Sequence, residues 1–505
     1  MSKLYRDILY LIFEELQYEK ETLASCLAVN KTWCETVIPV LWKDPWGFYI
    51  NHEKKKLLLN TIISHLADET RNGIKKRFIY FTSSYKKPLF NYISFCKHLN
   101  LEILEGIIKN IFTNNYYEEI KNDILDLFIN ENMEYTHLYI SKNFDYNFIP
   151  GAELCFSKIE YLKIDDRVDN NILSILTKIC KSIKELKISI NESEYNYGIA
   201  KLIENQKNLI NISFLNDFSN DKSSREIIEN SLVKHSNTIQ YFSAHGQLET
   251  KVLSSFVNLK MLELIGNYND KELEWDNIRD LSLPSLQTLN AINIPINCLT
   301  NLIESSGRQF TKIYYYSYFN DVFSNKKLIQ TICHNCPNLV YLELLYKNEN
   351  IVDLERLLIN CQNLKRLDFY YNNVSLFCRI QINNTEWDNL FNILAKSSPP
   401  SLFEFIFKYT DDKPGLESLK LFFDNWEGRH PVSLKFETDC RKVNNELIDL
   451  IGRYKEKGVV KKFVYYSHFH KELDLSMRCN TKKVIRKPET KSTTSIWNRL
   501  KMLFN

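Results

Sequence analysis

The stretch Leu339-Val340-Tyr341-Leu342-Glu343-Leu344 carries the pattern that decides the fold, apolar-x-x-apolar-x-apolar. Its second half alternates with period two, which predicts a short β-strand that buries Leu342 and Leu344 on one face. The phrase recurs from about residue 135 onward, at steps of roughly 20 to 30 residues with a longer step before Leu402. Clear copies begin at Ile159, Ile183, Leu259 and Leu364; weaker ones begin near Leu209, Ile239, Leu286, Phe310 and Leu402, and another is centred on Phe463.

Segments with helical periodicity lie between the copies, and examples are 171–179, 224–232 and 326–333. The number and spacing of the copies resemble leucine-rich repeats. That resemblance implies an α/β fold for residues 133–480, a solenoid with a parallel concave sheet and outer helices. Asn precedes the first apolar residue of the copies at Leu209, Leu259, Leu339 and Leu364.

The first forty-odd residues predict three short amphipathic helices. Apolar residues at positions 9, 12, 13 and 16 share one helical face, as do those at 23, 26 and 27 and those at 33, 37 and 41. So small a unit has to dock on something to be stable. The order of residues, a Leu-led helix ending Ile-Phe-x-x-Leu, then Val-Asn-Lys-x-Trp and a trailing Leu-Trp, resembles the F-box.

The F-box resemblance implies that residues 1–45 bind a small Skp-type adaptor, which connects the protein to a cullin–RING ubiquitin ligase. Tyr5 stands where the family usually has Pro, which favours a helix start. The alternative is an ordinary helical cap at the N-terminus. Matched to the family, the expected adaptor contacts are Leu4, Ile8, Leu9, Ile12, Leu16, Leu23, Leu27, Val29 and Trp33.

Residues 46–132 are predicted to couple the F-box to the solenoid and to include degenerate first repeats. The pattern indicates helices over 52–66, 101–111 and 118–129 and an irregular first strand over 77–82. Residues 481–505 read as a basic linker followed by a helix with Ile496, Leu500, Leu503 and Phe504 on one face. That helix either caps the repeat stack or lies on a membrane surface.

Strand alternation predicts which side chains face the concave surface. The early strands offer His137, Tyr139, Tyr161, Lys163, Glu185 and Lys187, a mixed charged surface. The later strands offer aromatic and apolar residues, so we expect a protein target there. A phase error of one residue would bury the set, and 29 Tyr make some alignment expected by chance. The expected partner contacts are Met261, Ile265, Tyr314, Tyr316, Tyr341, Leu345, Arg366 and Tyr370.

Bulk properties exclude several classes of function. A net charge of +3 gives no electrostatic case for nucleic acid, and 12 Gly make glycine-built phosphate cradles improbable. The charged start and the lack of a long apolar run predict neither a signal peptide nor a transmembrane segment. We therefore expect a cytoplasmic or nuclear protein, or both, and no cofactor.

Cysteine and histidine patterns do not predict a metal site. The 12 Cys are too few for a disulfide scaffold in 505 residues, and Cys180, Cys336 and Cys361 fall at one position of the repeat, as buried small side chains would. The C-x-x-C of residues 333–336 has no second pair at zinc-finger distance, and His468-Phe469-His470 has no evident third ligand.

Catalytic motifs of hydrolases, metalloproteases, P-loop proteins and dinucleotide-binding proteins do not occur. Asp165-Asp166 and Asp411-Asp412 read as solvated turn residues rather than an acid–base pair. The sequence therefore predicts a protein that is not an enzyme, with no catalytic residues. The expected function is a substrate receptor that bridges the adaptor and ligase to a protein bound on the concave face. The alternatives are a leucine-rich-repeat scaffold with no role in ubiquitylation and an enzyme whose site has no recognisable motif.

Overall fold

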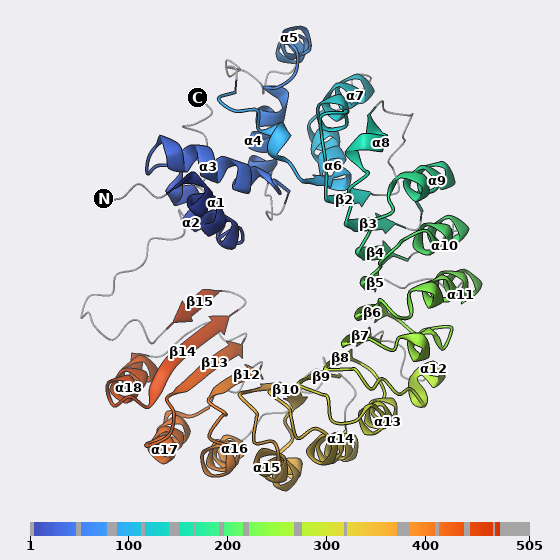
Figure 1. Ribbon diagram of the computed structural model, residues 1–505. Helices are drawn as coiled ribbons and strands as arrows, with labels where there is room; N and C mark the ends of the chain where they lie inside the picture. The colour runs from blue at the N-terminus through green and yellow to red at the C-terminus, as the bar shows by residue number, and fades with distance from the viewer. Residues whose placement is uncertain are drawn as a thin grey trace. The chain divides into compact units, whose positions relative to one another are not determined.

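The computed structural model (Figure 1) divides the chain into two compact units, with the boundary between Leu209 and Ile210. We call the part through Leu209 the N-terminal unit and the part from Ile210 the C-terminal unit. The structure describes residues 5–46, 52–77, 88–112, 117–140, 151–165, 167–190, 196–215, 222–266, 275–317, 321–370, 384–409, 414–438, 445–467 and 470–474.

Three helices begin the N-terminal unit and form a helical module: α1 (Arg6–Glu15), α2 (Lys20–Cys26) and α3 (Lys31–Trp42). Leu9, Phe13 and Leu23 are buried in its core, because they recur on the helix faces that meet. The Asn30 side chain accepts a hydrogen bond from the Trp33 amide at 3.0 Å and caps α3. The three predicted helices are therefore present.

Further helices and the first strands complete the N-terminal unit. The predicted helix over 101–111 is confirmed residue for residue, whereas α5 was not predicted, and Arg77 ends α5 instead of starting a strand. Residues 78–82 of that expected strand lie outside the described residues. The helices are α4 (His52–Ile63), α5 (Asp68–Arg77), α6 (Leu101–Ile111), α7 (Tyr117–Phe128), α8 (Ala152–Cys155), α9 (Asn170–Ile179) and α10 (Asn196–Glu204), with a short 3₁₀ turn η2 (Ile93–Phe95).

The sheet of the N-terminal unit contains β1 (His98–Asn100), β2 (His137–Ile140), β3 (Tyr161–Asp165) and β4 (Glu185–Ser189), paired in parallel. Strand pairing thus starts at His98, earlier than the first recognisable copy. β1 has three residues and buries only Leu99, so the sequence there shows no apolar–polar alternation from which a strand could be predicted.

The helical module continues directly into β1. The Lys43 carbonyl, just after α3, accepts hydrogen bonds from the amides of Lys97 at 2.9 Å and His98 at 3.1 Å. The Trp46 indole N–H donates to the His98 carbonyl at 2.5 Å. These bonds supply the partners that an edge strand otherwise lacks, and they connect the module firmly to the first repeat.

The C-terminal unit repeats a strand and a helical segment along the chain. Its strands are β5 (Asn211–Leu215), β6 (Tyr241–His245), β7 (Met261–Ile265), β8 (Thr288–Ile292), β9 (Lys312–Tyr316), β10 (Tyr341–Leu345), β11 (Arg366–Tyr370), β12 (Glu404–Tyr409), β13 (Val432–Thr438), β14 (Val460–Ser467) and β15 (His470–Asp474). Neighbours among the described strands pair in parallel, except that β15 runs antiparallel to β14.

Helices line one side of this sheet and leave the other side open (Figure 1). They are α11 (Lys222–Ser231), α12 (Asp276–Arg279), α13 (Ile296–Ser306), α14 (Val322–Asn335), α15 (Ile351–Asn360), α16 (Asn384–Ser397), α17 (Leu416–Trp426) and α18 (Asn445–Glu456). The 3₁₀ turns η3 (Leu232–His235), η4 (Val252–Ser255) and η5 (Asn348–Asn350) stand in or beside the helical layer. This is the predicted α/β architecture, a helical module followed by a leucine-rich-repeat-type solenoid.

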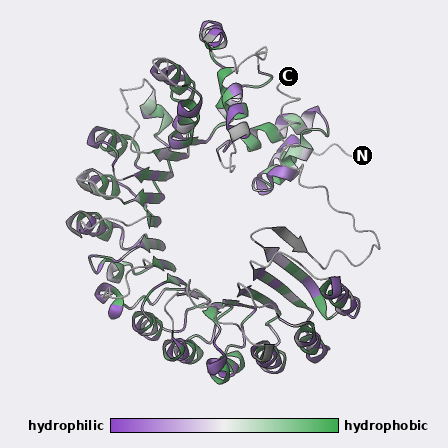
Figure 2. Ribbon diagram, turned by 180° about the vertical axis from the view of Figure 1, so that it is seen from behind, coloured by the Kyte–Doolittle hydropathy of each residue, from purple (hydrophilic) through white to green (hydrophobic). Residues whose placement is uncertain are grey.

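The core lies between sheet and helices, where strand residues alternate between buried and partly exposed. Leu342 pairs in register with Ile313 and Leu367, and all three are buried. Figure 2 shows hydrophobic and hydrophilic residues alternating along β12–β14. Stacked side chains of this kind let each repeat bury its apolar face against its neighbours.

Polar side chains join successive repeats at fixed positions. The Cys180 thiol donates to the Phe156 carbonyl at 3.4 Å and the Cys361 thiol to the Cys336 carbonyl at 3.6 Å. Burial raises the pKa of each of these two thiols to about 12, so both stay protonated donors. The Asn258 amide group bonds the Asn237 carbonyl at 2.8 Å, which gives the Asn before the apolar phrase a structural role.

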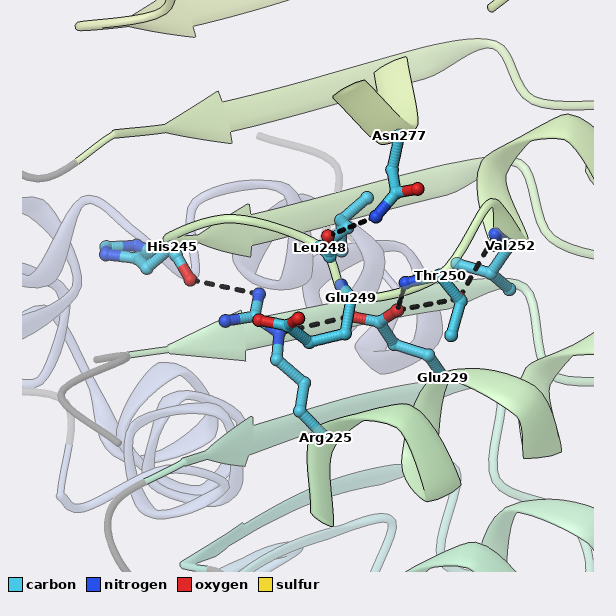
Figure 3. A network of polar contacts seen from close by, with 8 residues as sticks. All are labelled: Arg225, Glu229, His245, Leu248, Glu249, Thr250, Val252 and Asn277. Atoms are coloured by element: carbon cyan, nitrogen blue, oxygen red, sulfur yellow. Dashed lines mark hydrogen bonds and ion pairs between the residues drawn. The ribbon is translucent and has the colours of Figure 1, made fainter. Parts of the chain in front are cut away.

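One ion pair is buried in the helical layer (Figure 3). Arg225 Nε lies 3.1 Å from Glu229 Oε1, and both side chains are almost fully buried. Glu229 also accepts hydrogen bonds from the amides of Glu249 and Thr250 and from the Thr250 hydroxyl, while Arg225 donates to the His245 carbonyl. The pair thereby holds the turn after β6 against α11.

Candidate functional site

The candidate site is the open face of the C-terminal unit's sheet, which we call the inner surface. It consists of the alternate strand positions that register places on this face, and four of them (Leu345, Asp368, Tyr370 and Ile406) are buried. Across β7–β12 these positions are Met261, Glu263, Ile265, Thr288, Asn290, Ile292, Lys312, Tyr314, Tyr316, Tyr341, Glu343, Leu345, Arg366, Asp368, Tyr370, Glu404, Ile406 and Lys408.

Tyr341, Arg366 and Asp368 form a connected group on β10 and β11. The Tyr341 hydroxyl donates to Asp368 Oδ2 at 2.6 Å. Arg366 Nε and Nη2 each lie 2.9 Å from an oxygen of the same carboxylate, and the guanidinium lies 4.9 Å from the centre of the Tyr341 ring. Tyr314 of β9 packs on the other side, with ring centroids 4.3 Å apart. The sequence-predicted Tyr314, Tyr341 and Arg366 are thus brought together.

The electrostatics of this group keep Arg366 charged and Tyr341 protonated. The hydrogen bond to Asp368 raises the pKa of the Arg366 guanidinium. Burial and the bond to Asp368 raise the pKa of the Tyr341 hydroxyl. Tyr341 is therefore a hydrogen-bond donor, and the pair Arg366–Asp368 is a bidentate ion pair of the strong type.

Lys408 and Glu343 form a second ion pair on the inner surface, with Nζ 2.6 Å from Oε1. The two residues come from β12 and β10, and β11 lies between these strands. Burial raises the pKa of the Glu343 carboxyl, and the nearby Lys408 ammonium opposes that shift. Alternation in the copy near Leu402 places Lys408 on this face, but the sequence carried no signal that it pairs with Glu343.

An apolar row lies two residues beyond Glu263, Asn290 and Tyr314, toward the ends of β7, β8 and β9. Ile265, Ile292 and Tyr316 are in register on β7, β8 and β9 and are partly exposed. Ile292 was missed as a partner contact, although it occupies the strand position of Ile265 in the copy that begins near Leu286. Met261 is also partly exposed, as predicted, at the other end of β7.

The expected exposure of Leu345 and Tyr370 is wrong, because both are buried. The Tyr370 hydroxyl accepts a hydrogen bond from the Ser317 amide at 3.0 Å, and its ring lies 4.5 Å from that of Tyr316. Tyr370 therefore reaches from β11 across β10 to the end of β9.

The helical module has a second exposed surface. Ile8, Ile12 and Val29 are 46%, 42% and 55% exposed, and Leu11, which sequence reasoning missed, is exposed beside them on α1. Leu9, Leu23 and Leu27 are instead buried in the module's own core, and their contact with an adaptor stays a prediction.

Two further F-box positions are partly buried, and one cannot be placed. Leu16 and Trp33 are half-buried, and Trp33 packs edge-on against Phe13 at 5.3 Å. Leu4 lies outside the described residues. Of the eight expected contacts that the structure describes, three are therefore exposed, two are partly buried and three are buried.

The inner strand positions of the N-terminal unit carry stacked rings. The His98 and His137 rings are 3.8 Å apart, and Tyr161 stacks on His137 at 5.1 Å. Asp44, next to the module, lies 3.5 Å from His98 Nδ1. Burial and the neighbouring His98 lower the pKa of His137 to about 4, so His137 is neutral near pH 7.

The remaining sequence motifs do not form a metal site among the described residues. Cys336 is buried and Cys333 accepts a hydrogen bond from Asn360, and among the described residues no three His, Cys, Asp or Glu side chains could hold a metal ion. In the same part of the chain no helix is long and apolar enough to cross a membrane. Residues 166, 411–412, 468–469 and 481–505, with the expected C-terminal helix, lie outside the described residues.

Comparison with known proteins adds the following findings. No family model matches the chain, and no curated protein matches it. Among solved structures the chain is similar to LegL7 of Legionella pneumophila, a leucine-rich repeat-containing protein, with 13% identity, a TM-score of 0.27, and coverage of 72% of this chain and 90% of LegL7.

Proposed function

We propose that this protein is a substrate receptor that does not itself catalyse a reaction. Its helical module would bind a Skp-type adaptor of a cullin–RING ubiquitin ligase, and its inner surface would bind the target protein. A repeat solenoid with an open strand face suits protein binding, because its surface is wide and its backbone hydrogen bonds are already satisfied. This function would place the protein in the cytoplasm, the nucleus or both.

The observation that carries the adaptor part is the exposed apolar side of α1. Ile8, Leu11 and Ile12 face solvent, while Leu9 and Phe13 on the same helix fill the core. A helix of ten residues with apolar side chains on both sides needs a partner on its outer side. Val29, after α2, adds to the exposed apolar residues of the same module.

Two further features support the proposal. Tyr5 precedes α1 with φ −61° and ψ 145°, a backbone geometry that proline also adopts, so Tyr in place of Pro does not disturb the helix start. The hydrogen bonds from Lys97 and His98 to the Lys43 carbonyl join the module to the repeats. A stiff joint of this kind would hold the adaptor-bound module in a set position on the first repeats of its own unit.

The test is co-purification of the full chain with a Skp-type adaptor. We expect stoichiometric binding by the wild type and loss of binding in the double variant Ile8→Glu/Ile12→Glu. The control is Leu421→Glu on α17, which places one such charge at an exposed apolar residue of the C-terminal unit. A thermal unfolding curve of each variant separates lost binding from lost folding.

Absence of adaptor binding by the wild type would overturn the proposal. The function would then be that of a repeat scaffold with no role in ubiquitylation. Equal binding by the wild type and by the folded Ile8→Glu/Ile12→Glu variant would place the adaptor on another surface and contradict our use of α1.

A further inference from the structure

The inner surface carries few free cations, because two of its basic side chains are held in ion pairs. Across β7–β12 its cations are Lys312, Arg366 and Lys408, and its carboxylates are Glu263, Glu343, Asp368 and Glu404. Arg366 forms an ion pair with Asp368 and is also attracted electrostatically by Glu404, and Lys408 forms an ion pair with Glu343. The next strand, β13, repeats this arrangement with Lys435 2.8 Å from Glu437. Such a surface has one carboxylate more than it has cations, so its charge does not favour an acidic or phosphorylated partner.

We propose that the inner surface of β7–β12 binds an unphosphorylated segment of a protein through aliphatic and aromatic side chains. The inference deepens the proposed function and rests on one part of it, that this surface binds the target. It names the chemical class of the target segment and excludes a phosphorylated motif as the recognition signal.

Arg366 is the residue that a phosphate would be expected to seek, since bidentate guanidinium contacts are the usual means of phosphate recognition. Here the Nε edge already makes two bonds of 2.9 Å to Asp368. Asp368 is 1% exposed and accepts hydrogen bonds from Arg366 and Tyr341. If Arg366 turned to a phosphate, the buried carboxylate would lose its positive partner and keep only the bond from Tyr341. Burying a charge without its partner is strongly unfavourable, and the arginine is therefore held by its own strand.

The apolar row provides the attractive part of the surface. Ile265, Ile292 and Tyr316 are adjacent through strand register, and buried Tyr370 supports Tyr316 from the side. The paired rings of Tyr314 and Tyr341 continue the aromatic surface at neighbouring positions of β9 and β10. Asp368 holds the Tyr341 hydroxyl. A tyrosine that is held in place loses little entropy when a partner docks, and tyrosines are frequent hot spots of interfaces.

Two oriented peptide libraries test the proposal. Each has random residues around a fixed central position, serine in one library and phosphoserine in the other, and the immobilised full chain selects from both. We expect enrichment of aromatic and aliphatic residues from the serine library, with no added retention of the phosphoserine library. Binding of a selected peptide should weaken about tenfold or more in Ile292→Asp, a loss typical of a hot-spot contact.

Val257→Asp is the matched control, because Val257 is an exposed apolar residue of the same unit that lies before β7 and outside the inner surface. Preferential retention of the phosphoserine library would overturn the inference, as would selection of acidic peptides, an unchanged affinity in Ile292→Asp, or no selection from either library.

The two proposals fail in distinguishable ways. A chain that selects apolar peptides through Ile292 but binds no adaptor supports this inference and overturns the ligase role. A chain that binds the adaptor through α1 and prefers phosphoserine peptides supports the ligase role and overturns this inference.

Discussion

Two arginine–carboxylate pairs occupy different layers of the C-terminal unit. Arg225 and Glu229 lie in the helical layer, with side chains 2% and 0% exposed, whereas Arg366 and Asp368 lie on the inner surface at 37% and 1%. Burial lowers the pKa of Arg225, and the bond to Asp368 raises that of Arg366. The chemistry of the two pairs is alike, but only the second has a side that water and a partner can reach.

The difference shows how one kind of pair serves two purposes. Arg225–Glu229 takes the place of apolar packing and connects a turn to a helix. Removing one partner should therefore lower the free energy of unfolding. Arg366–Asp368 orders a tyrosine-rich surface. Its removal should therefore lower the free energy of unfolding only modestly and should mainly disturb the arrangement of that surface.

The largest effect is expected from Glu229→Ala. The change leaves Arg225 buried and charged, and the amides of Glu249 and Thr250 lose their acceptor. We expect the free energy of unfolding, measured by urea denaturation, to fall by about 3–5 kcal/mol.

The double variant Arg225→Met/Glu229→Leu is the control for this prediction. It removes both charges and fills the space with apolar side chains, so it should retain more stability than the single variant. A single variant as stable as the double one would contradict the structural role of the pair.

A smaller effect is expected from Asp368→Asn. Arg366 loses its ionic partner but can turn toward solvent, and the Tyr341 hydroxyl can still donate to the amide oxygen. The same urea measurement should show a loss of about 1–2 kcal/mol. Glu404→Gln, on the neighbouring strand, should change stability little. A loss as large as that of Glu229→Ala would erase the distinction between the two layers.

His137 differs from both arginines in having no carboxylate bonded to its ring, so burial shifts its pKa without an ion pair to oppose the shift. Its pKa falls from 6.5 in the unfolded chain to about 4 in the fold. The unfolded state therefore binds the proton first, so stability is full above pH 6.5 and declines as the pH falls toward 4. Unfolding midpoints measured between pH 7.5 and about pH 4.5 should decline less steeply in His137→Gln than in the wild type. His334→Gln, at an exposed helix position, should keep the wild-type slope.

The smallest effect is expected from Lys435→Ala. Lys435 and Glu437 are each about one-third exposed, so solvent screens their 2.8 Å contact. Unfolding free energy should change by no more than about 1 kcal/mol, and less at high salt. A larger loss would show that pairs on the strand surface can stabilise the fold as strongly as the buried one.

Much of the fold could be predicted from the sequence. Leu342 and Leu344 alternate with polar neighbours, and burial of such pairs at every copy of the phrase is what the structure contains. The prediction failed where the signal was short or the contact distant. β1 has one buried residue, and the burial of Tyr370 depends on a hydrogen bond to Ser317, which lies 53 positions earlier in the chain.

The helical module shows the same limit. Apolar spacing indicated that α1 is amphipathic, yet it grouped Leu9 and Ile12 on one face, and packing buries the first and exposes the second. Which side of a helix with apolar residues all round is covered depends on the helices that dock against it.

The sequence by itself determined the repeated strand and helix, their order, and the helical module ahead of them, because local periodicity decides which face of each element must be buried. Only the packing of distant residues shows that Arg225–Glu229 is buried, that Tyr370 spans two strands, and that Arg366 and Lys408 are held in ion pairs on the inner surface. Those features join residues from different repeats or from a helix and a distant turn. Their energies depend on distance and burial, which no local pattern encodes.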